Sequence, residues 1–269
     1  MRTTLKWTGI GLGALCVVVV LVLAFFDWNL LRGPISRIIA ARIDRPVRIA
    51  KLHVVLLSGR PYAELSGLQI GNPVWAGGGR MADIERVRIE LAWGSLLKAQ
   101  LVLPRVEIDK PDLYLFSNTE GRANWLFGAT APSRHAPESS AVARANNKPT
   151  RLPVLRTLVI EAGRLRVIDQ ERKLVFTGTV GTRGAGASAA EAFQLLGSGQ
   201  LNDKPFSLRV GGGPLIWAES HKPYPFEIEV RADGTHASAH GTVPRPFDLG
   251  QLDVTLSAAG EDLADLYYL

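Results

Sequence analysis

Two histidines four positions apart, His236 and His240, come closest to a catalytic or metal-binding pattern. On a helix this spacing places both imidazoles on one face, where they can bind zinc. The surrounding segment, 235–241, instead alternates in the manner of a strand, and neither a cysteine nor a group of carboxylates nearby completes a ligand set. We therefore interpret both histidines as solvent-facing side chains of a strand, and the sequence predicts no metal site.

The sequence also lacks the motifs that carry nucleophilic catalysis and nucleotide binding. It contains neither a G-x-S-x-G nucleophile elbow nor a GxxxxGK[ST] phosphate loop. The glycine runs at 77–79 and 211–213 are not followed by a helix that would direct amides at a phosphate, so both are interpreted as turns. Carboxylates are scattered, and aromatic residues do not interleave with basic ones as on a nucleic-acid platform. The sequence predicts no catalytic residue, no cofactor, no nucleic-acid partner and no enzyme.

The balance of charge favours anionic partners. The 269 residues carry a formal net charge of +6, and the sequence pI is near 9.7. The densest group of basic residues directly follows the first apolar segment and consists of Arg32, Arg37, Arg42, Arg45 and Arg48. That position favours lipid headgroups over nucleic acid, and a solvated basic face without a ligand is the alternative.

Residues 7–26 form an uncharged apolar run that predicts one transmembrane helix, because about 20 such residues span the hydrocarbon core. Trp7 and Trp28 flank this run, as interfacial aromatic residues do. A cleaved signal peptide is the alternative, but the run exceeds the usual ~7–15 residues and no A-x-A site follows. The single cysteine, Cys16, lies inside the run, so no disulfide can form within one chain. Residues 1–6 are expected in the cytoplasm, although positive-inside counting alone leaves the orientation open.

The chain beyond this anchor begins with a helical pattern and continues with strands. Residues 34–44 place four isoleucines on one helical face, which predicts an amphipathic helix that caps the following sheet or lies on the membrane. From residue 46 the hydrophobic period is two, as expected for strands with one buried face. The predicted strands are 62–70 with a break at Gly67, 86–91, 105–109, 112–116, 158–160, 165–167, 174–176, 193–201, 205–211, 225–232, 235–243 and 250–258. Turn-forming residues at 161–164 predict a hairpin between the two strands that flank them.

Composition divides the β-rich region into two parts. Residues 128–153 are mostly small, polar or proline, which predicts a flexible linker or long loop. A first β-rich part with its capping helix occupies 34–127, with a short helical turn expected at 94–98, and a second part occupies 154–269. Residues 262–269 have the pattern of a helix start without a stop signal, so we expect the second part to be truncated at its C-terminus.

Several local patterns together resemble the AsmA family of bacterial envelope proteins. They follow the family's order over nearly the whole chain and are Phe26-Asp27-Trp28-Asn29, Asp44-Arg45-Pro46-Val47, Leu68-Gln69-Ile70-Gly71-Asn72-Pro73, Val106-Glu107-Ile108-Asp109-Lys110-Pro111, Gly121-Arg122-Ala123-Asn124-Trp125, Gly197-Ser198-Gly199-Gln200-Leu201-Asn202 and Ala232-Asp233-Gly234-Thr235. The second is similar to the family's GRPV segment, with Asp44 where glycine is usual. The fifth is similar to the family's G-x-x-NW segment.

The resemblance implies an inner-membrane anchor with the bulk of the chain in the bacterial periplasm. It also implies a mainly β fold related to bridge-like lipid-transfer proteins, in which a long curved antiparallel sheet with a few short helices forms a repeating β-groove. An apolar groove of this kind holds acyl chains and needs no catalytic residue. The expected function is envelope biogenesis, in which the protein holds or guides phospholipid and affects outer-membrane assembly or protein targeting to the membrane.

The candidate groove lining consists of apolar residues on the alternating strands of the first β-rich part. These residues are Leu65, Leu68, Ile70, Val87, Ile89, Leu91, Val106, Ile108, Leu113 and Leu115. The expected partners are the phospholipid bilayer, phospholipid acyl chains in the groove, and envelope proteins. Two alternatives stay open. The same apolar face would equally serve as packed core, and the protein would equally serve as a non-enzymatic periplasmic scaffold that binds another envelope protein through an open sheet edge.

Overall fold

The computed structural model describes residue 14 and residues 26–92, 102–127, 154–182, 192–216, 223–232, 234–244 and 253–259. Several predictions lie outside these residues: the cytoplasmic segment, the predicted anchor apart from Ala14 and Phe26, the turn at 94–98, the linker and the C-terminal helix start. Among the described residues, no helix is long and apolar enough to cross a membrane.

The helices come early in the chain. They are η1 (Trp28–Leu31), α2 (Arg32–Ile43) and η2 (Val74–Ala76). The side chain of Asp27 caps η1, because its carboxylate accepts a hydrogen bond from the Asn29 amide at 3.0 Å. The predicted helix at 34–44 is confirmed as α2, which begins two residues earlier than expected and ends at Asp44 in the left-handed conformation (φ 53°).

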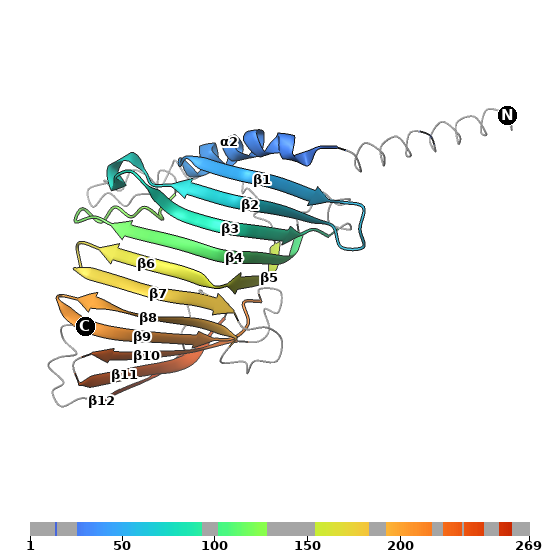
Figure 1. Ribbon diagram of the computed structural model, residues 1–269. Coiled ribbons are helices and arrows are strands. Elements are labelled where there is room, and N and C mark those ends of the chain that lie inside the picture. The colour runs from blue at the N-terminus through green and yellow to red at the C-terminus, as the bar shows by residue number, and fades with distance from the viewer. Residues whose placement is uncertain are drawn as a thin grey trace, which may run out of the picture.

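The rest of the described chain is a single sheet of twelve strands (Figure 1). The strands are β1 (Val47–Val55), β2 (Tyr62–Gly71), β3 (Arg80–Glu90), β4 (Val102–Ser117), β5 (Val154–Glu161), β6 (Gly163–Asp169), β7 (Leu174–Thr182), β8 (Phe193–Leu201), β9 (Lys204–Gly212), β10 (Tyr224–Ala232), β11 (Thr235–Val243) and β12 (Asp253–Ala259). β8 and β11 have the predicted bounds, and the segments predicted at 105–109 and 112–116 are one strand, β4, with Pro111 inside it. The sheet is therefore continuous across both predicted β-rich parts.

The predicted hairpin at 161–164 is wrong. β5 and β6 run in the same direction, and both pair in parallel with β4 in one register, from Val102↔Val154 to Ser117↔Asp169. Ala162 between them has a φ of 49°, which bends the chain without reversing it. The sheet is thus mixed rather than purely antiparallel, since every other pairing in the described order is antiparallel.

A break in the apolar–polar alternation crosses the first five strands side by side. Two consecutive residues separate the inward-pointing ones within β1–β4 and at the junction of β5 and β6: Ala50-Lys51, Ser66-Gly67, Glu85-Arg86, Asp109-Lys110 and Glu161-Ala162. Gly67 and Lys110 share the positive φ of Ala162, at 63° and 46°. We call this line of residues the alternation break. Because it shifts the side-chain phase by one residue, as a β-bulge does, the apolar side chains on both sides of it stay on one face.

The register shows which residues share a face, because directly opposite residues in paired strands point the same way. One row crosses the whole sheet and is almost entirely apolar: Val47, Ile70, Ala82, Leu113, Leu165, Gly178, Gly197, Leu208, Val230, Ala237 and Ala258. The adjacent row on the other face is polar over its first six strands: Arg48, Gln69, Asp83, Asp112, Arg164 and Thr179. We call these two sides the apolar face and the polar face.

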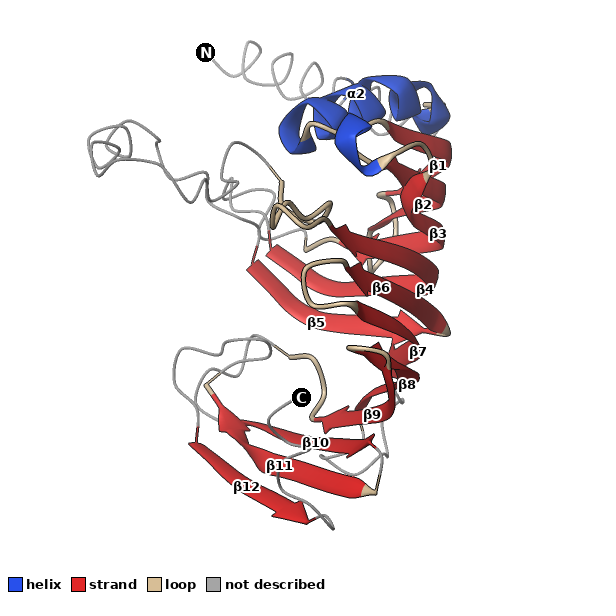
Figure 2. Cartoon of the chain, turned by 90° about the vertical axis from the view of Figure 1, so that its left-hand side faces the viewer, coloured by secondary structure: helices blue, strands red, loops and turns tan. Residues whose placement is uncertain are grey.

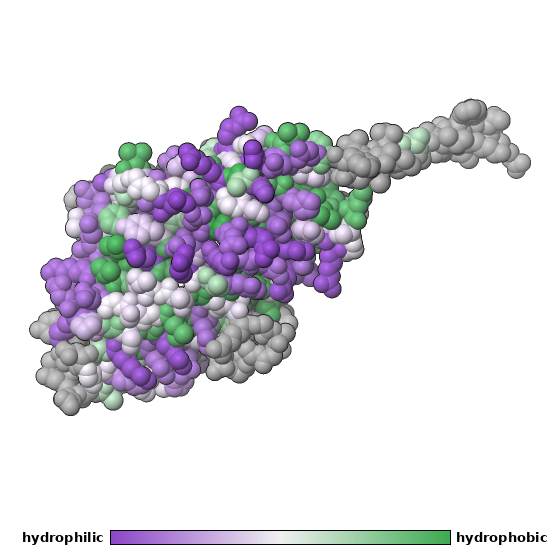
Figure 3. Space-filling model, in the orientation of Figure 1, coloured by the Kyte–Doolittle hydropathy of each residue, from purple (hydrophilic) through white to green (hydrophobic). Residues whose placement is uncertain are grey.

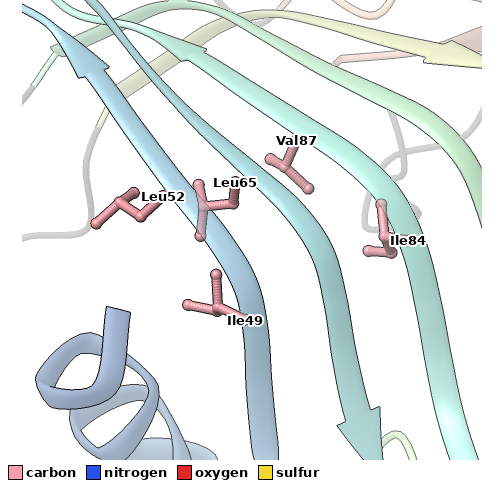
Figure 4. Close-up of a cluster of buried hydrophobic side chains, with 5 residues drawn as sticks. All are labelled: Ile49, Leu52, Leu65, Ile84 and Val87. Atoms are coloured by element: carbon pink, nitrogen blue, oxygen red, sulfur yellow. The ribbon is translucent and has the colours of Figure 1, made fainter. Parts of the chain in front are cut away.

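The sheet is curved, and α2 and strands β10–β12 reach toward the same side of it (Figure 2). Helix α2 covers the apolar face at the β1 end, where Leu31, Ile35 and Ile39 pack against the first strands. The opposite side, seen in Figure 3, is dominated by hydrophilic residues. The tightest core lies beneath the helix and consists of Ile49, Leu52, Leu65, Ile84 and Val87 (Figure 4).

Candidate functional site

Most of the candidate groove residues lie together on the apolar face. Leu65 and Val87 are buried members of the core beneath α2, each with 8% of its surface exposed. The partly buried residues packed against that core include Leu68, Ile89, Val106 and Ile108. These six candidates come from both sides of the alternation break, so the phase shift is what brings them into one cluster.

The other candidates extend the cluster or leave it. Ile70 and Leu113 belong to the apolar row that crosses the sheet, and Leu115 begins the neighbouring row with Val167 and Phe176. Leu91 lies one residue beyond the end of β3, where its amide donates a hydrogen bond to the carbonyl of Pro61 at 2.8 Å. Lipid contact at any of these positions stays a prediction.

The apolar face differs along its length in how well it is covered. Under α2 the side chains of β1–β3 are packed as core. Further along, Leu165, Leu208 and Val230 are only half-buried, and the helices in the described part of the chain, η1, α2 and η2, all precede β3. The exceptions are Phe176, which is 5% exposed and stacks on Phe206 at 6.0 Å between ring centroids, and the residues Phe193, Ala232 and Val243, which are 4–8% exposed. Among the described residues, the middle of the apolar face between β6 and β11 is therefore only partly covered.

Sequence reasoning missed this second half of the face. The alternation at 205–211 and 225–232 predicted the strands correctly, yet the face shared by Leu208, Val230 and Leu113 depends on the register of five successive strand pairings. The alternation after Pro205 and Pro225 was the available signal for these inward residues. It identifies them within each strand, but it does not show which strands pair.

The polar face carries ion pairs between neighbouring strands. Arg164 contacts Asp112 at 3.0 Å, Lys110 contacts Glu85 at 2.8 Å, and Arg86 pairs with Asp109. The hydrogen bond from Lys110 lowers the pKa of the Glu85 carboxyl below its ordinary value. At least one side chain of each pair is about half-exposed or more, so each pair contributes little to stability. Their charged groups make this face of the sheet suited to contact with water.

His236 and His240 lie exposed on β11, opposite Arg231 and Glu227. Residues four apart on a strand are about 13 Å apart, too far to bind one metal ion together. Within the ranges that the structure describes, no group of three or more His, Cys, Asp and Glu side chains is placed to hold a metal.

Three segments that are distant in the sequence meet at the end of the sheet where β1 begins. The fully buried Asn124 joins them through its side chain. Its Nδ2 donates to Asn72 Oδ1 at 2.9 Å and to the Tyr114 carbonyl at 2.8 Å, and its Oδ1 accepts a hydrogen bond from the backbone N–H of Phe116. The backbone N–H of Asn124 also donates to the Phe116 carbonyl at 2.9 Å. Asn124 thus provides hydrogen-bond partners for the backbone groups of Tyr114 and Phe116, in the part of β4 that extends past its last pairing with β3. Sequence reasoning quoted this residue only as part of a family pattern.

The fold places the chain in the class of mainly β proteins built on one long, open, mostly antiparallel sheet. The chain belongs to the AsmA family, whose family model matches residues 1–180. It is similar to the AsmA family protein YhjG of Escherichia coli strain K12, with 26% identity over 286 aligned positions that cover 95% of this chain. The match covers 40% of that relative's length. Family membership indicates an envelope-associated protein of a generally non-catalytic kind.

Proposed function

We propose that this protein holds or guides phospholipid, with the acyl chains lying on the apolar face between β6 and β11, as part of envelope biogenesis at the inner membrane. The bulk of the chain would then lie in the periplasm, where it would affect outer-membrane assembly or protein targeting to the membrane. The observation that carries the proposal is the apolar row that runs without a charged residue from β1 to β12, and whose larger members beyond the helix, Leu165, Leu208 and Val230, are only half-buried. Half-buried apolar surface on this scale is the type of surface that binds an apolar ligand.

Neighbouring residues on β9 provide a direct test. Leu208 points to the apolar face, whereas Ser207 lies in a row with Ser198 and Arg231 on the polar face. We would place the photo-crosslinking residue p-benzoylphenylalanine at position 208 or 207 of the full chain in its native membrane. Irradiation should produce a phospholipid-sized mass increase on the 208 variant and little on the 207 variant.

A second experiment uses charge. Leu208→Asp should reduce the phospholipid that copurifies with the full chain, measured by native mass spectrometry with lipid extraction, because a carboxylate on the apolar face disfavours acyl chains. Ser207→Asp is the matched control and should leave the lipid ratio unchanged. Equal crosslinking at both positions, or unchanged lipid in a folded Leu208→Asp protein, would show that acyl chains do not lie on this face.

A scaffold that binds another envelope protein is the second candidate, and β12 favours it. All seven of its residues are exposed, and among the described residues it pairs only with β11. An open edge of this kind can receive a strand from another protein. The scaffold function predicts a protein crosslinked at Thr255 of β12, with no lipid adduct at position 208.

A further inference from the structure

A cavity of about 670 Å³ lies at the end of the sheet where the strand β1 begins, apart from the uncovered half of the apolar face. Its walls come from the C-terminal end of α2, from the loop that follows β2 and from the segment that follows β4. The buried Asn124 amide ties the last two together. The cavity is therefore a built feature of the fold, formed by three chain segments.

Two guanidinium groups line this cavity, those of Arg45 and Arg122. The Arg122 guanidinium lies 5.3 Å from the ring centre of Trp75. It also forms an ion pair with Glu120 at 2.5 Å, in which both side chains are about half-exposed or more. Water screens such a pair strongly, so the Arg122 guanidinium keeps donors available to a ligand.

Arg45 is the more unusual group. It is half-buried, and its two Nη atoms donate to the main-chain carbonyls of Asp44 and Leu126 at 2.7 and 3.1 Å. Its Nε is buried without a hydrogen-bond partner, and within the described ranges no ion pair neutralises its charge. A partly desolvated guanidinium that bonds only to neutral carbonyls is stabilised by a bound anion.

The surroundings combine this positive charge with apolar surface. Val74, Leu126 and Phe127 are exposed by 101%, 38% and 44% respectively, and the Arg45 guanidinium lies 5.9 Å from the ring centre of Phe127. The Asp44 carboxylate also lines the cavity, so the lining residues alone carry a net excess of one positive charge, while Glu120 lies outside the lining as the partner of Arg122. A singly charged anion with an adjoining carbon skeleton fits this balance better than a doubly charged one.

We propose that the cavity binds a phosphodiester anion, with Arg45 and Arg122 as its ligands. Guanidinium groups suit phosphate oxygens because their N–H donors are arranged in a planar fork. A phospholipid headgroup and a soluble glycerophosphodiester share this chemistry. The proposal does not depend on acyl chains lying on the apolar face, since the residues that line the cavity differ from those of the apolar face between β6 and β11.

The test uses glycerophosphoglycerol, a headgroup without acyl chains, titrated into the full chain in a non-ionic detergent and followed by phosphorus NMR and calorimetry. We expect saturable binding that Arg122→Gln and Arg45→Gln each weaken about tenfold or more, because a charge-assisted hydrogen bond is lost. Arg48→Gln is the matched control: Arg48 is exposed on the polar face of β1, outside the cavity, and its loss should change affinity less than about twofold.

Two further arms identify the source of the anion. Displacement of the probe by phosphatidylglycerol added in mixed micelles with the same detergent would identify a lipid headgroup. Probe binding that these micelles leave intact would identify a soluble phosphodiester, and either result supports the site. No binding of the probe, or equal weakening by Arg48→Gln, would overturn it. Arg122→Gln keeps the test decisive if Arg45→Gln unfolds, because Arg122 is about half-exposed. Since the probe has no acyl chain, failure here leaves the apolar-face proposal untouched.

Discussion

The two edge strands of the sheet, β1 and β12, differ in how far other parts of the described chain cover them. At β1 the edge is covered: Asn29 Oδ1 accepts from the Leu52 amide at 3.2 Å, and Arg32 donates to the Ala50 carbonyl at 2.7 Å. At β12 every residue is exposed, with Leu256 exposed by 73%. Both ends use the same alternating pattern of apolar and polar residues.

The difference shows that alternation alone does not separate core from binding surface. An apolar residue becomes core where a helix lies over it, as α2 does with Ile35 and Ile39 over the cluster that contains Leu65. The same residue type in the same phase stays accessible where no described helix lies over it, as at Leu208. The covered end therefore contains the packed core, and the remainder of the apolar face is only partly covered by the described residues.

The largest expected effect comes from the same substitution at the two ends. Leu65→Ala should lower the free energy of unfolding by about 2–4 kcal/mol, because it leaves a cavity in the packed core. Leu256→Ala should change it by about 0.5 kcal/mol or less, because this side chain is already exposed. Urea unfolding of the full chain in detergent measures both values. Equal losses would mean that β12 is covered in the folded protein.

The next effect tests the hydrogen bonds of the covered end. Asn124→Ala should cost about 1–3 kcal/mol, because it leaves buried partners on Asn72, Tyr114 and Phe116 unsatisfied. Asn118→Ala is the control, since the bonds that Asn118 accepts from the Glu120 and Arg122 amides are exposed. A loss at Asn118 as large as that at Asn124 would contradict the role assigned to burial.

A pH-dependent effect is expected near the uncovered end. Burial raises the pKa of Tyr224 to about 12, and its hydroxyl donates to the Gly213 carbonyl at 3.0 Å. An unfolded tyrosine ionises near pH 10, so the stability that Tyr224 provides is fully present below pH 10 and is lost as the pH rises toward 12. At pH 9, Tyr224→Phe should cost about 0.5–1.5 kcal/mol. The difference between the two proteins should shrink across that window, and parallel unfolding curves from pH 9 to 11.5 would contradict this assignment.

The smallest effect concerns the end of α2. Asp44 follows α2 in the left-handed conformation, with a φ of 53°, and glycine adopts this conformation without strain. Asp44→Gly should therefore raise the free energy of unfolding by about 0.5 kcal/mol. Asp44→Ala keeps the strain and loses the polar side chain, so it should lower stability instead. Thermal unfolding of both variants compares them directly, and a stabilising alanine would argue against this explanation.

Local pattern was a good guide to the secondary structure. Alternation predicted β8 and β11 with their observed bounds, and the isoleucine spacing predicted α2. The pattern failed at Ala162-Gly163, where turn-forming residues suggested a reversal. There the preceding strand β4 supplies a parallel partner for both flanking segments, and that pairing joins residues 52 positions apart, such as Asp109 and Glu161. Pairing at that separation leaves no local signal.

The candidate site divides in the same way. The sequence by itself determined which residues are apolar and alternate, and Leu65, Leu68, Val87, Ile89, Val106 and Ile108 do cluster. Only the tertiary structure decided that they lie on one face across the alternation break, that α2 covers them, and that the accessible surface lies further along at Leu208 and Val230. The physical reason is that side-chain type depends on the residue alone, whereas the face it occupies and its cover depend on register and on helix packing between distant segments.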